Sequence, residues 1–224
     1  MAAKYVEDYQ LALRSFGQAH EMGAGAAAEE GRKVFDLVRR LTTLVERKHD
    51  LKAKRLRELT SDLPEGPQHR VLKELQAGEG GEAPLQARVV SLMQRKDEVP
   101  VILACCDRAG DFFALSVYNA ELQRLAEVVI PMKSVLFVKA PRFRQVSVVS
   151  PEGKAWTYPS VTVGHPAEVT LATGETLAAA AVQSLVFSTG ADRTTSEQSS
   201  LGTSGWSPAT ASAERRGAGA SLAE

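Results

Sequence analysis

The feature that most constrains the fold is a series of seven short runs, rich in valine and aromatic residues, that begins after Pro84. Turn-forming residues separate the runs, for instance at 107–110, at Pro141 and at 151–153. Because no ten-residue helix lies between the runs, they predict a closed or nearly closed antiparallel sheet rather than a parallel one. The runs are QARVVSLMQR, VPVILACC, FFALSVYN, SVLFVKA, RQVSVVS, WTYPSVTV and AEVTLAT.

Two amphipathic helices are expected ahead of this sheet. In residues 4–22 the spacing Y-x-x-A-x-x-x-F-x-x-A, from Tyr9 to Ala19, is typical of the second helix of a tetratricopeptide repeat, in which small residues let helices pack closely. An ordinary amphipathic helix is the alternative. GAGAAAEEG is expected to break this helix, and residues 29–48 to form a second one with an apolar stripe and an opposite basic side.

Basic residues cluster locally, although the whole chain has 27 basic and 27 acidic residues and a formal net charge of zero. Residues 32–57 hold ten basic and three acidic side chains, a local charge of +7. Leu51, Leu56 and Leu59 give this stretch an apolar inward side after an expected bend near His49 and Asp50. The cluster favours contact with a phosphate backbone, and a solvated helix face is the alternative.

These patterns divide the chain into four parts. We expect an α+β protein with a helical segment at 1–63 and a linker at 64–84. A β-barrel domain follows at 85–187, and a disordered tail, poor in large apolar residues, at 188–224. Within the barrel domain, residues 121–129 are expected to form one inserted helical segment, whereas the alanine-rich 175–187 fits no pattern.

The sequence shows no recognisable catalytic or cofactor-binding motif, so we expect a non-enzymatic protein without metal or cofactor. The four histidines are scattered, and Cys105 and Cys106 lie in an apolar run, where we expect them to be core residues of a protein from a reducing compartment. The N-terminus lacks the apolar stretch of a signal peptide, and no apolar run is long enough for a bilayer, so no membrane partner is expected.

Basic and aromatic side chains on the predicted barrel form a second candidate site. Trp156 and Tyr158 share one face of a strand by the period of two, and such groups can stack bases and hold phosphates. The alternative is a barrel core with a charged rim. The candidate ligand face comprises Arg142, Arg144, Lys154, Trp156 and Tyr158.

Three stretches resemble the C-terminal part of the tetratricopeptide repeat protein 5 family, also called Strap. They are RRLTTLVERKHDLKAKRLREL (39–59), VVSLMQRKDEVPVILACCDRAGDFFALSVYNAE (89–121) and GKAWTYPSVTV (153–163). The likeness runs from about Tyr5 to about Gly174 in the family's order. It implies a last repeat helix, a basic helical connection and an OB-fold domain.

The resemblance also implies a function. The family associates with ribosomes, recognises the N-terminal peptide of nascent tubulin and triggers decay of tubulin messenger RNA. Its Lys-x-Lys pair that contacts ribosomal RNA corresponds here to Lys52 and Lys54. We therefore expect a cytoplasmic adaptor whose ribosomal RNA contacts are Lys52, Lys54, Arg47, Lys48, Arg55 and Arg57.

Two further expectations follow from the resemblance. The family reads tubulin with an array of repeats, and this chain begins inside the last one, so nascent tubulin is an expected partner only if repeats precede it. A fragment of a longer protein and a short form are both compatible with this. The second functional interpretation is a nuclear stress-response cofactor whose OB-fold domain binds DNA or a histone acetyltransferase coactivator.

Overall fold

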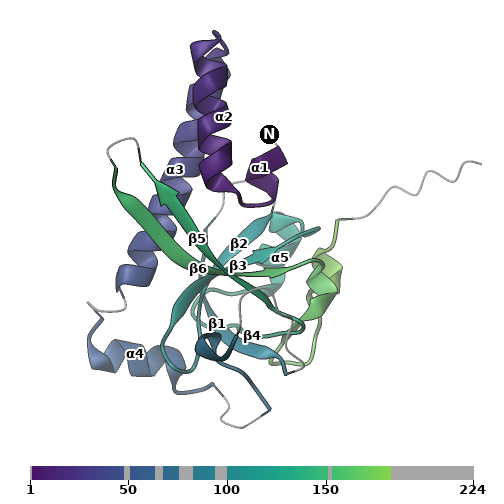
Figure 1. Ribbon diagram of the computed structural model, residues 1–224. Coiled ribbons are helices and arrows are strands. Elements are labelled where there is room, and N and C mark those ends of the chain that lie inside the picture. The colour runs from purple at the N-terminus through teal and green to yellow at the C-terminus, as the bar shows by residue number, and fades with distance from the viewer. Residues whose placement is uncertain are drawn as a thin grey trace, which may run out of the picture. The chain divides into compact units, whose positions relative to one another are not determined.

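In the computed structural model, residues 1–184 make up one compact unit (Figure 1). The structure describes residues 2–47, 51–63, 68–75, 83–93, 100–150 and 153–182. Helices come first and a β-barrel follows, which confirms the predicted fold class. The expected bend at 49–50 and the expected disordered tail at 188–224 lie outside the described residues, and the domain boundaries at 63, 84 and 187 stay predictions.

The N-terminal region contains helices α1 (Ala2–Tyr5), α2 (Tyr9–Glu21) and α3 (Gly25–Glu46). The expectation that all of GAGAAAEEG separates two helices is wrong, because α3 begins at Gly25 and alanine is the strongest helix former. The repeat-like positions of α2, Tyr9, Ala12 and Phe16, are buried. A Cβ atom at Gly31 of α3 would lie 3.4 Å from Phe16 Cβ, so a small residue permits the close approach of α2 and α3.

The barrel consists of β1 (Leu85–Leu92), β2 (Val101–Cys106), β3 (Phe112–Val117), β4 (Val135–Val138), β5 (Arg142–Val149), β6 (Ala155–Val163) and β7 (Val169–Leu171). The strand order is β5-β6-β3-β2-β1-β4-β7. Pairing is antiparallel except between β3 and β6. Strand β4 pairs with β1 and strand β5 with β6, and only residues 139–141 separate β4 from β5, so the chain crosses there from one side of the sheet order to the other.

Two helical segments lie next to each other against the barrel core. Helix α5 (Leu122–Val128) lies between β3 and β4, as the sequence predicted, and buries Leu125. The alanine-rich segment that fitted no pattern forms a 3₁₀ helix, η4 (Leu177–Ala180), and buries Leu177 and Ala180 in the same core. None of the helices in the described part of the chain combines the length and hydropathy that crossing a membrane requires.

Strands β2 and β3 are buried along their whole length and therefore on both faces. Leu103, Cys105 and Leu115 point into the barrel core. The alternate residues of the two strands face outward, where they pack under helices; among them are Ile102 and Ala104. Both cysteines are buried, which confirms their prediction as core residues.

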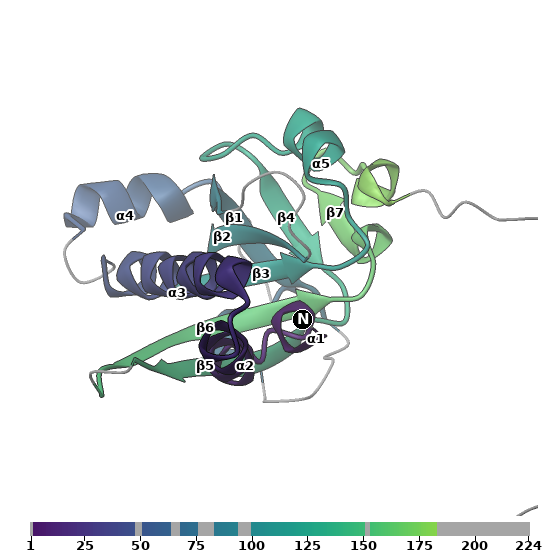
Figure 2. The ribbon, with the colours of Figure 1, turned by 90° about the horizontal axis from the view of Figure 1, so that it is seen from above.

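Helices α2 and α3 cover this outer face of the barrel. Figure 2 shows α3 running beside β3 and α2 above the hairpin of β5 and β6. Their apolar stripes form one core with the outer residues of β2, β3, β5 and β6. The helices contribute Tyr9, Ala12, Phe16, Ala27, Val34, Leu37, Val38 and Leu41 to this core.

Part of the predicted linker belongs to the barrel. Residues 68–75 include a 3₁₀ helix, η2 (Leu72–Glu74), and Leu72 and Leu75 are buried in the barrel core. The Leu72 amide donates a 2.8 Å hydrogen bond to the buried carboxylate of Asp107, whose other oxygen accepts from the Asp111 amide. Asp107 thus joins the 68–75 segment to the turn between β2 and β3.

Because α3 packs on the barrel, truncating a residue of the shared core should destabilise the whole unit. Leu41 of α3 is 1% exposed, whereas Leu11 of α2 is 50% exposed. We expect Leu41→Ala to lower the free energy of unfolding by about 2–5 kcal/mol, and Leu11→Ala by less than about 0.5 kcal/mol. Urea unfolding followed by circular dichroism measures both. Equal effects would show that α3 does not pack on the barrel.

Candidate nucleic-acid interface

The predicted Lys-x-Lys pair lies at the start of helix α4 (Ala53–Thr60), with Lys52 as the N-cap residue and Lys54 in the first turn. Both lysines are exposed and have no ion-pair partner among the residues that the structure describes. The first turn, described in full, holds no acidic side chain. Free amide groups and the helix dipole already make this terminus positive, so two lysines there favour an anion.

Helix α4 is fixed to the barrel by its apolar side. Leu59 is buried against Cys106 and Phe112, at the end of β2 and the start of β3. Leu56 lies over Gly110, whose φ of +77° and lack of a Cβ atom allow the contact; a Cβ atom there would lie 3.0 Å from Leu56 Cδ1. The lysines therefore extend from a packed scaffold.

The other predicted RNA-binding residues differ in their surroundings. Arg55 and Arg57 are exposed on α4, and Arg55 forms a 2.8 Å ion pair with Glu58. Arg47 caps the C-terminal end of α3, and its carbonyl accepts a hydrogen bond from the Leu51 amide, so it lies next to the start of α4. Lys48 lies outside the described residues.

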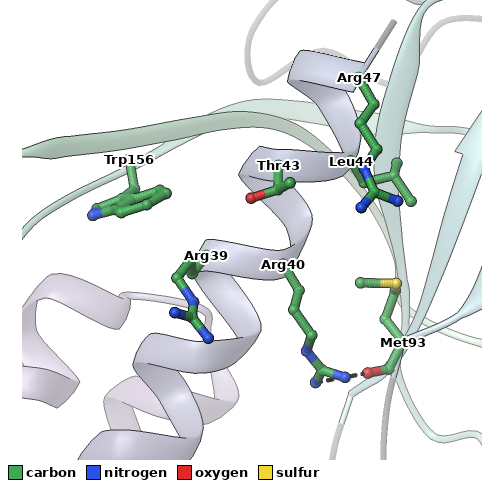
Figure 3. Close-up of a pocket in the computed structure, with 7 residues that line it drawn as sticks. All are labelled: Arg39, Arg40, Thr43, Leu44, Arg47, Met93 and Trp156. Carbon is green, nitrogen blue, oxygen red and sulfur yellow. Dashed lines mark hydrogen bonds between the residues drawn. The ribbon is translucent and has the colours of Figure 1, made fainter. Parts of the chain in front are cut away.

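Arg47 also lines a pocket between α3 and the barrel, with a volume of about 490 Å³. In Figure 3, Trp156 of β6 lies on one side of α3 and Met93, next to the end of β1, lies on the other, with the arginines extending from the helix between them. Arg40 Nη2 donates a 3.2 Å hydrogen bond to the Met93 carbonyl. The pocket is lined by Arg39, Arg40, Thr43, Leu44, Arg47, Met93 and Trp156.

The structure does not bring the five predicted barrel residues together on one open face. Lys154 Nζ lies 4.1 Å from the ring centroid of Trp156, and Arg142 is exposed on β5. Tyr158, in contrast, is 0% exposed beneath the helices. Arg144 is engaged by the N-terminal segment, since its Nη1 donates a 2.8 Å hydrogen bond to the Val6 carbonyl.

The main partner of Arg144 is Glu7, a residue that sequence reasoning missed. The Glu7 side chain is 0% exposed and forms an ion pair with Arg144. Ser116 Oγ of β3 donates a 2.5 Å hydrogen bond to Glu7 Oε1, and Ser160 of β6 lies 3.4 Å from the same oxygen. Tyr118 donates to Oε2 at 3.4 Å. No sequence pattern links Glu7 to residues more than a hundred positions away.

Burial raises the pKa of the Glu7 carboxyl above its ordinary value of 4.5, and Arg144 and the three hydroxyl groups only partly offset this. The residue also has a φ of 55°, a left-handed conformation that non-glycine residues rarely adopt. A strained backbone and a buried carboxylate indicate that surrounding contacts fix this turn firmly.

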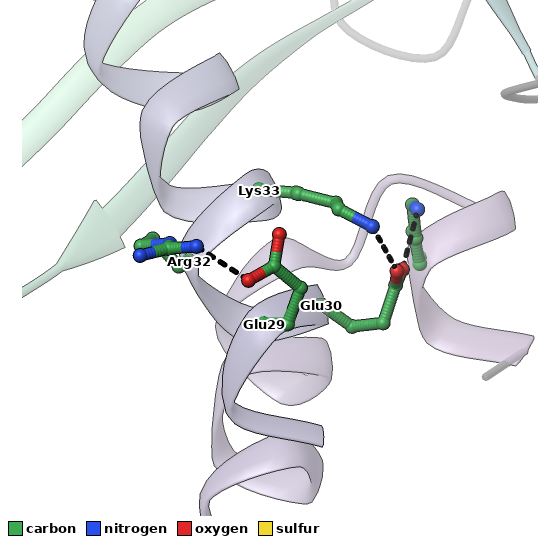
Figure 4. A network of polar contacts seen from close by, with 5 residues as sticks. Glu29, Glu30, Arg32 and Lys33 are labelled. Atoms are coloured by element: carbon green, nitrogen blue, oxygen red, sulfur yellow. Dashed lines mark hydrogen bonds and ion pairs between the residues drawn. The ribbon is translucent and has the colours of Figure 1, made fainter. Parts of the chain in front are cut away.

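A second polar contact ties α1 to α3 (Figure 4). Glu30 of α3 accepts hydrogen bonds from Lys4 of α1 at 3.2 Å and from Lys33 at 2.8 Å. The hydrogen bond from Lys33, followed by that from Lys4, lowers the pKa of the Glu30 carboxyl. Glu29 and Arg32 form a separate exposed pair on the same helix. The Lys4–Glu30 contact holds the N-terminal segment that carries Glu7.

Residues 67–185 match the family described as Tetratricopeptide repeat protein 5 OB fold domain. The match covers more than half of the 224 residues. The chain belongs to this family. This confirms the resemblance inferred from the sequence and identifies the barrel as the OB-fold domain. No curated protein matches the chain.

Three solved structures are similar to part of this chain. An OB domain from Methanosarcina mazei has a TM-score of 0.32 and 15% identity, covering 48% of this chain and 85% of that one. Schizosaccharomyces pombe Pot1pC bound to single-stranded DNA has a TM-score of 0.31 and 7% identity, covering 46% and 85%. Rim1, a mitochondrial single-stranded DNA-binding protein from S. cerevisiae, has a TM-score of 0.29 and 10% identity, covering 40% and 89%.

Within this OB-fold domain, the surface most often used for ligands is covered. OB-folds commonly bind oligonucleotides on the face of their second and third strands and on the loops beside it. Here the outer sides of β2 and β3 pack under α2, α3 and α4. Met93, just after β1, and Trp156, near the start of β6, line the pocket beside α3, and Lys154 lies over the Trp156 ring.

The raised pKa of Glu7 predicts a pH-dependent contribution to stability. A carboxyl whose folded pKa exceeds its unfolded pKa binds more protons when folded, so its stabilising contribution is full below about 4.5 and is lost as pH rises through the folded pKa. Glu7→Gln removes this titration. We expect the stability of the wild type relative to Glu7→Gln to fall as pH rises from about 4 to about 8 in urea unfolding.

Glu21→Gln, which changes an exposed glutamate at the end of α2, is the matched control and should show no such trend. If the free energy of unfolding of the wild type instead increased relative to that of Glu7→Gln as pH rises, the prediction would be contradicted. This result would mean that Arg144 outweighs burial and keeps the Glu7 carboxylate charged.

Proposed function

We propose that the protein is a non-enzymatic cytoplasmic adaptor that contacts ribosomal RNA through Lys52 and Lys54. The observation that carries the proposal is the position of the pair at the exposed, positively polarised start of α4, on a helix fixed to the barrel by Leu56 and Leu59. The resemblance of residues 39–59 to the tetratricopeptide repeat protein 5 family supports the proposal, because that family's Lys-x-Lys motif corresponds to these two residues.

The physical basis is the attraction of cations to a phosphate backbone. Lysine side chains place mobile ammonium groups against phosphates without requiring a fixed geometry, which suits contact with a folded RNA surface. Arg57 and Arg47 extend the same positive surface, and Arg55 can join it by leaving its exposed pair with Glu58, which contributes little stability. In tubulin autoregulation, such a contact would hold the factor on the translating ribosome.

The OB-fold domain acts in this proposal chiefly as the scaffold for α3 and α4. Its β2–β3 face is covered by helices, so a nuclear cofactor that binds DNA or a coactivator through that face would first have to displace them. The described residues offer no specific support for that second interpretation, and the proposal is confined to the ribosome contact.

Ribosome co-sedimentation at graded salt tests the proposal. We expect Lys52→Glu with Lys54→Glu to abolish pelleting at moderate salt, because two attractive contacts become repulsive. Neutral variants, Lys52→Gln with Lys54→Gln, should weaken binding and reduce the slope of log K against log salt by roughly two, since two phosphate contacts are lost.

The matched control is Lys133→Glu with Lys139→Glu, which makes the same change in net charge at exposed barrel residues. It should leave pelleting nearly unchanged. If the control and the Lys52 and Lys54 reversal reduce pelleting equally, binding depends only on net charge. If neither reduces it, α4 is not the contact. Either result sinks the proposal.

A further inference from the structure

The pocket between α3 and the β5–β6 hairpin combines positive charge with apolar surface. The pocket residues of α3 lie on one side of the helix, because they recur at spacings of three and four. They are Arg39, Arg40, Thr43, Leu44 and Arg47. Its arginines share the pocket lining with the apolar side chains of Leu44, Met93 and Trp156 (Figure 3). Of the described residues that line the pocket, none is acidic.

Trp156 is held in place before any ligand arrives. Its ring meets Phe35 of α3 edge-on, with ring centroids 6.0 Å apart and an interplanar angle of 86°. Lys154 lies over the same ring and is exposed to solvent. The hydrogen bond from Arg40 to the Met93 carbonyl fixes the opposite wall. A preorganised aromatic wall lowers the entropy lost when a ligand is bound.

The two kinds of lining group suit the two parts of a nucleotide. A planar base can pack against indole, leucine and methionine, while guanidinium groups form paired hydrogen bonds with phosphate oxygens. Arg39 is paired with Asp36, but both side chains are about half exposed, so the pair is weak and can exchange for a phosphate. A volume of about 490 Å³ lies within the range of small-ligand sites.

We propose that this pocket binds an unpaired nucleotide of a single-stranded nucleic acid, with the base against Trp156 and the phosphates on either side of it on Arg39 and Arg47. That this nucleic acid is RNA rests on the proposed function. Arg47 lies next to the start of α4, where Lys52 and Lys54 are proposed to contact ribosomal RNA. The pocket would then accept a base that is splayed out beside the backbone held by α4.

The chain offers a direct optical test, because it contains two tryptophans, Trp156 and Trp206. In the Trp206→Phe variant of the full chain, fluorescence reports on Trp156 alone. We expect a short oligouridine to quench this fluorescence saturably. Arg39→Glu in the same background should weaken the apparent affinity about tenfold or more, since a phosphate contact becomes repulsive.

Arg32→Glu is the matched control. Arg32 is also an exposed arginine of α3, also paired with an acidic residue three positions earlier, Glu29, but it lies outside this pocket. It should leave the affinity nearly unchanged. Trp156→Ala, followed by the anisotropy of labelled oligouridine, should weaken binding about tenfold, and Trp156→Phe should restore most of it because the ring is kept.

The comparison of ligands separates nucleotide recognition from general charge attraction. Oligouridine and the DNA ligand oligothymidine should both bind. Tighter binding of oligouridine would indicate an additional contact to the 2′-hydroxyl group. Three results would overturn the proposal: no saturable quenching, equal effects of Arg39→Glu and Arg32→Glu, or equally tight binding of polyglutamate, heparin or fully paired RNA. Equal binding of polyglutamate would point to an acidic peptide as the occupant.

The pocket and the ribosome contact can fail separately. If oligouridine does not quench Trp156 while Lys52→Glu with Lys54→Glu still abolishes ribosome pelleting, the pocket is wrong and the ribosome contact stands. If oligouridine quenches Trp156 but the lysine variants pellet normally, the pocket stands and the contact through α4 is wrong.

Discussion

The rest of the structure depends on the burial of β2 and β3 on both faces. A strand of a small barrel normally has one side in the core and one in water, and here the water-facing side is apolar as well. Exposing that side would place contiguous hydrophobic surface in solvent. Helices α2, α3 and α4 cover it, so they belong to the same folded unit as the barrel.

Apolar packing makes this cover stable, but it does not alone fix how the helices lie. The buried contacts around Glu7 are directional, because its carboxylate must meet hydroxyl groups of β3 and β6 and the guanidinium of Arg144 together. Gln10 adds a further polar contact, accepting a 2.7 Å hydrogen bond from the Val149 amide. A small number of polar contacts therefore sets the position of α2 over the barrel.

Because helices cover the β2–β3 face, the exposed basic side chains that could bind a partner lie at the ends of helices. The C-terminal part of α3 and the start of α4 carry most of the local positive charge, and both are attached to the barrel through leucines. Charge in a nearly neutral chain acts over about a Debye length, roughly 8 Å at physiological salt, so such local placement decides which partners are attracted. The proposed ribosome contact and the nucleotide pocket both use this concentrated charge.

Local sequence patterns were enough to predict the barrel, the two N-terminal helices, α5 and the buried cysteines, because periodicity and turn residues act over short distances. The resemblance to the family singled out Lys52 and Lys54. The tertiary contacts were needed to show that Arg144 binds Val6 and Glu7 of the N-terminal segment, that Tyr158 is buried beneath the helices and that Trp156 lines a pocket with the arginines of α3. These outcomes depend on contacts such as Glu7 with Ser116, between residues far apart in the chain, and no local pattern records which distant side chains meet.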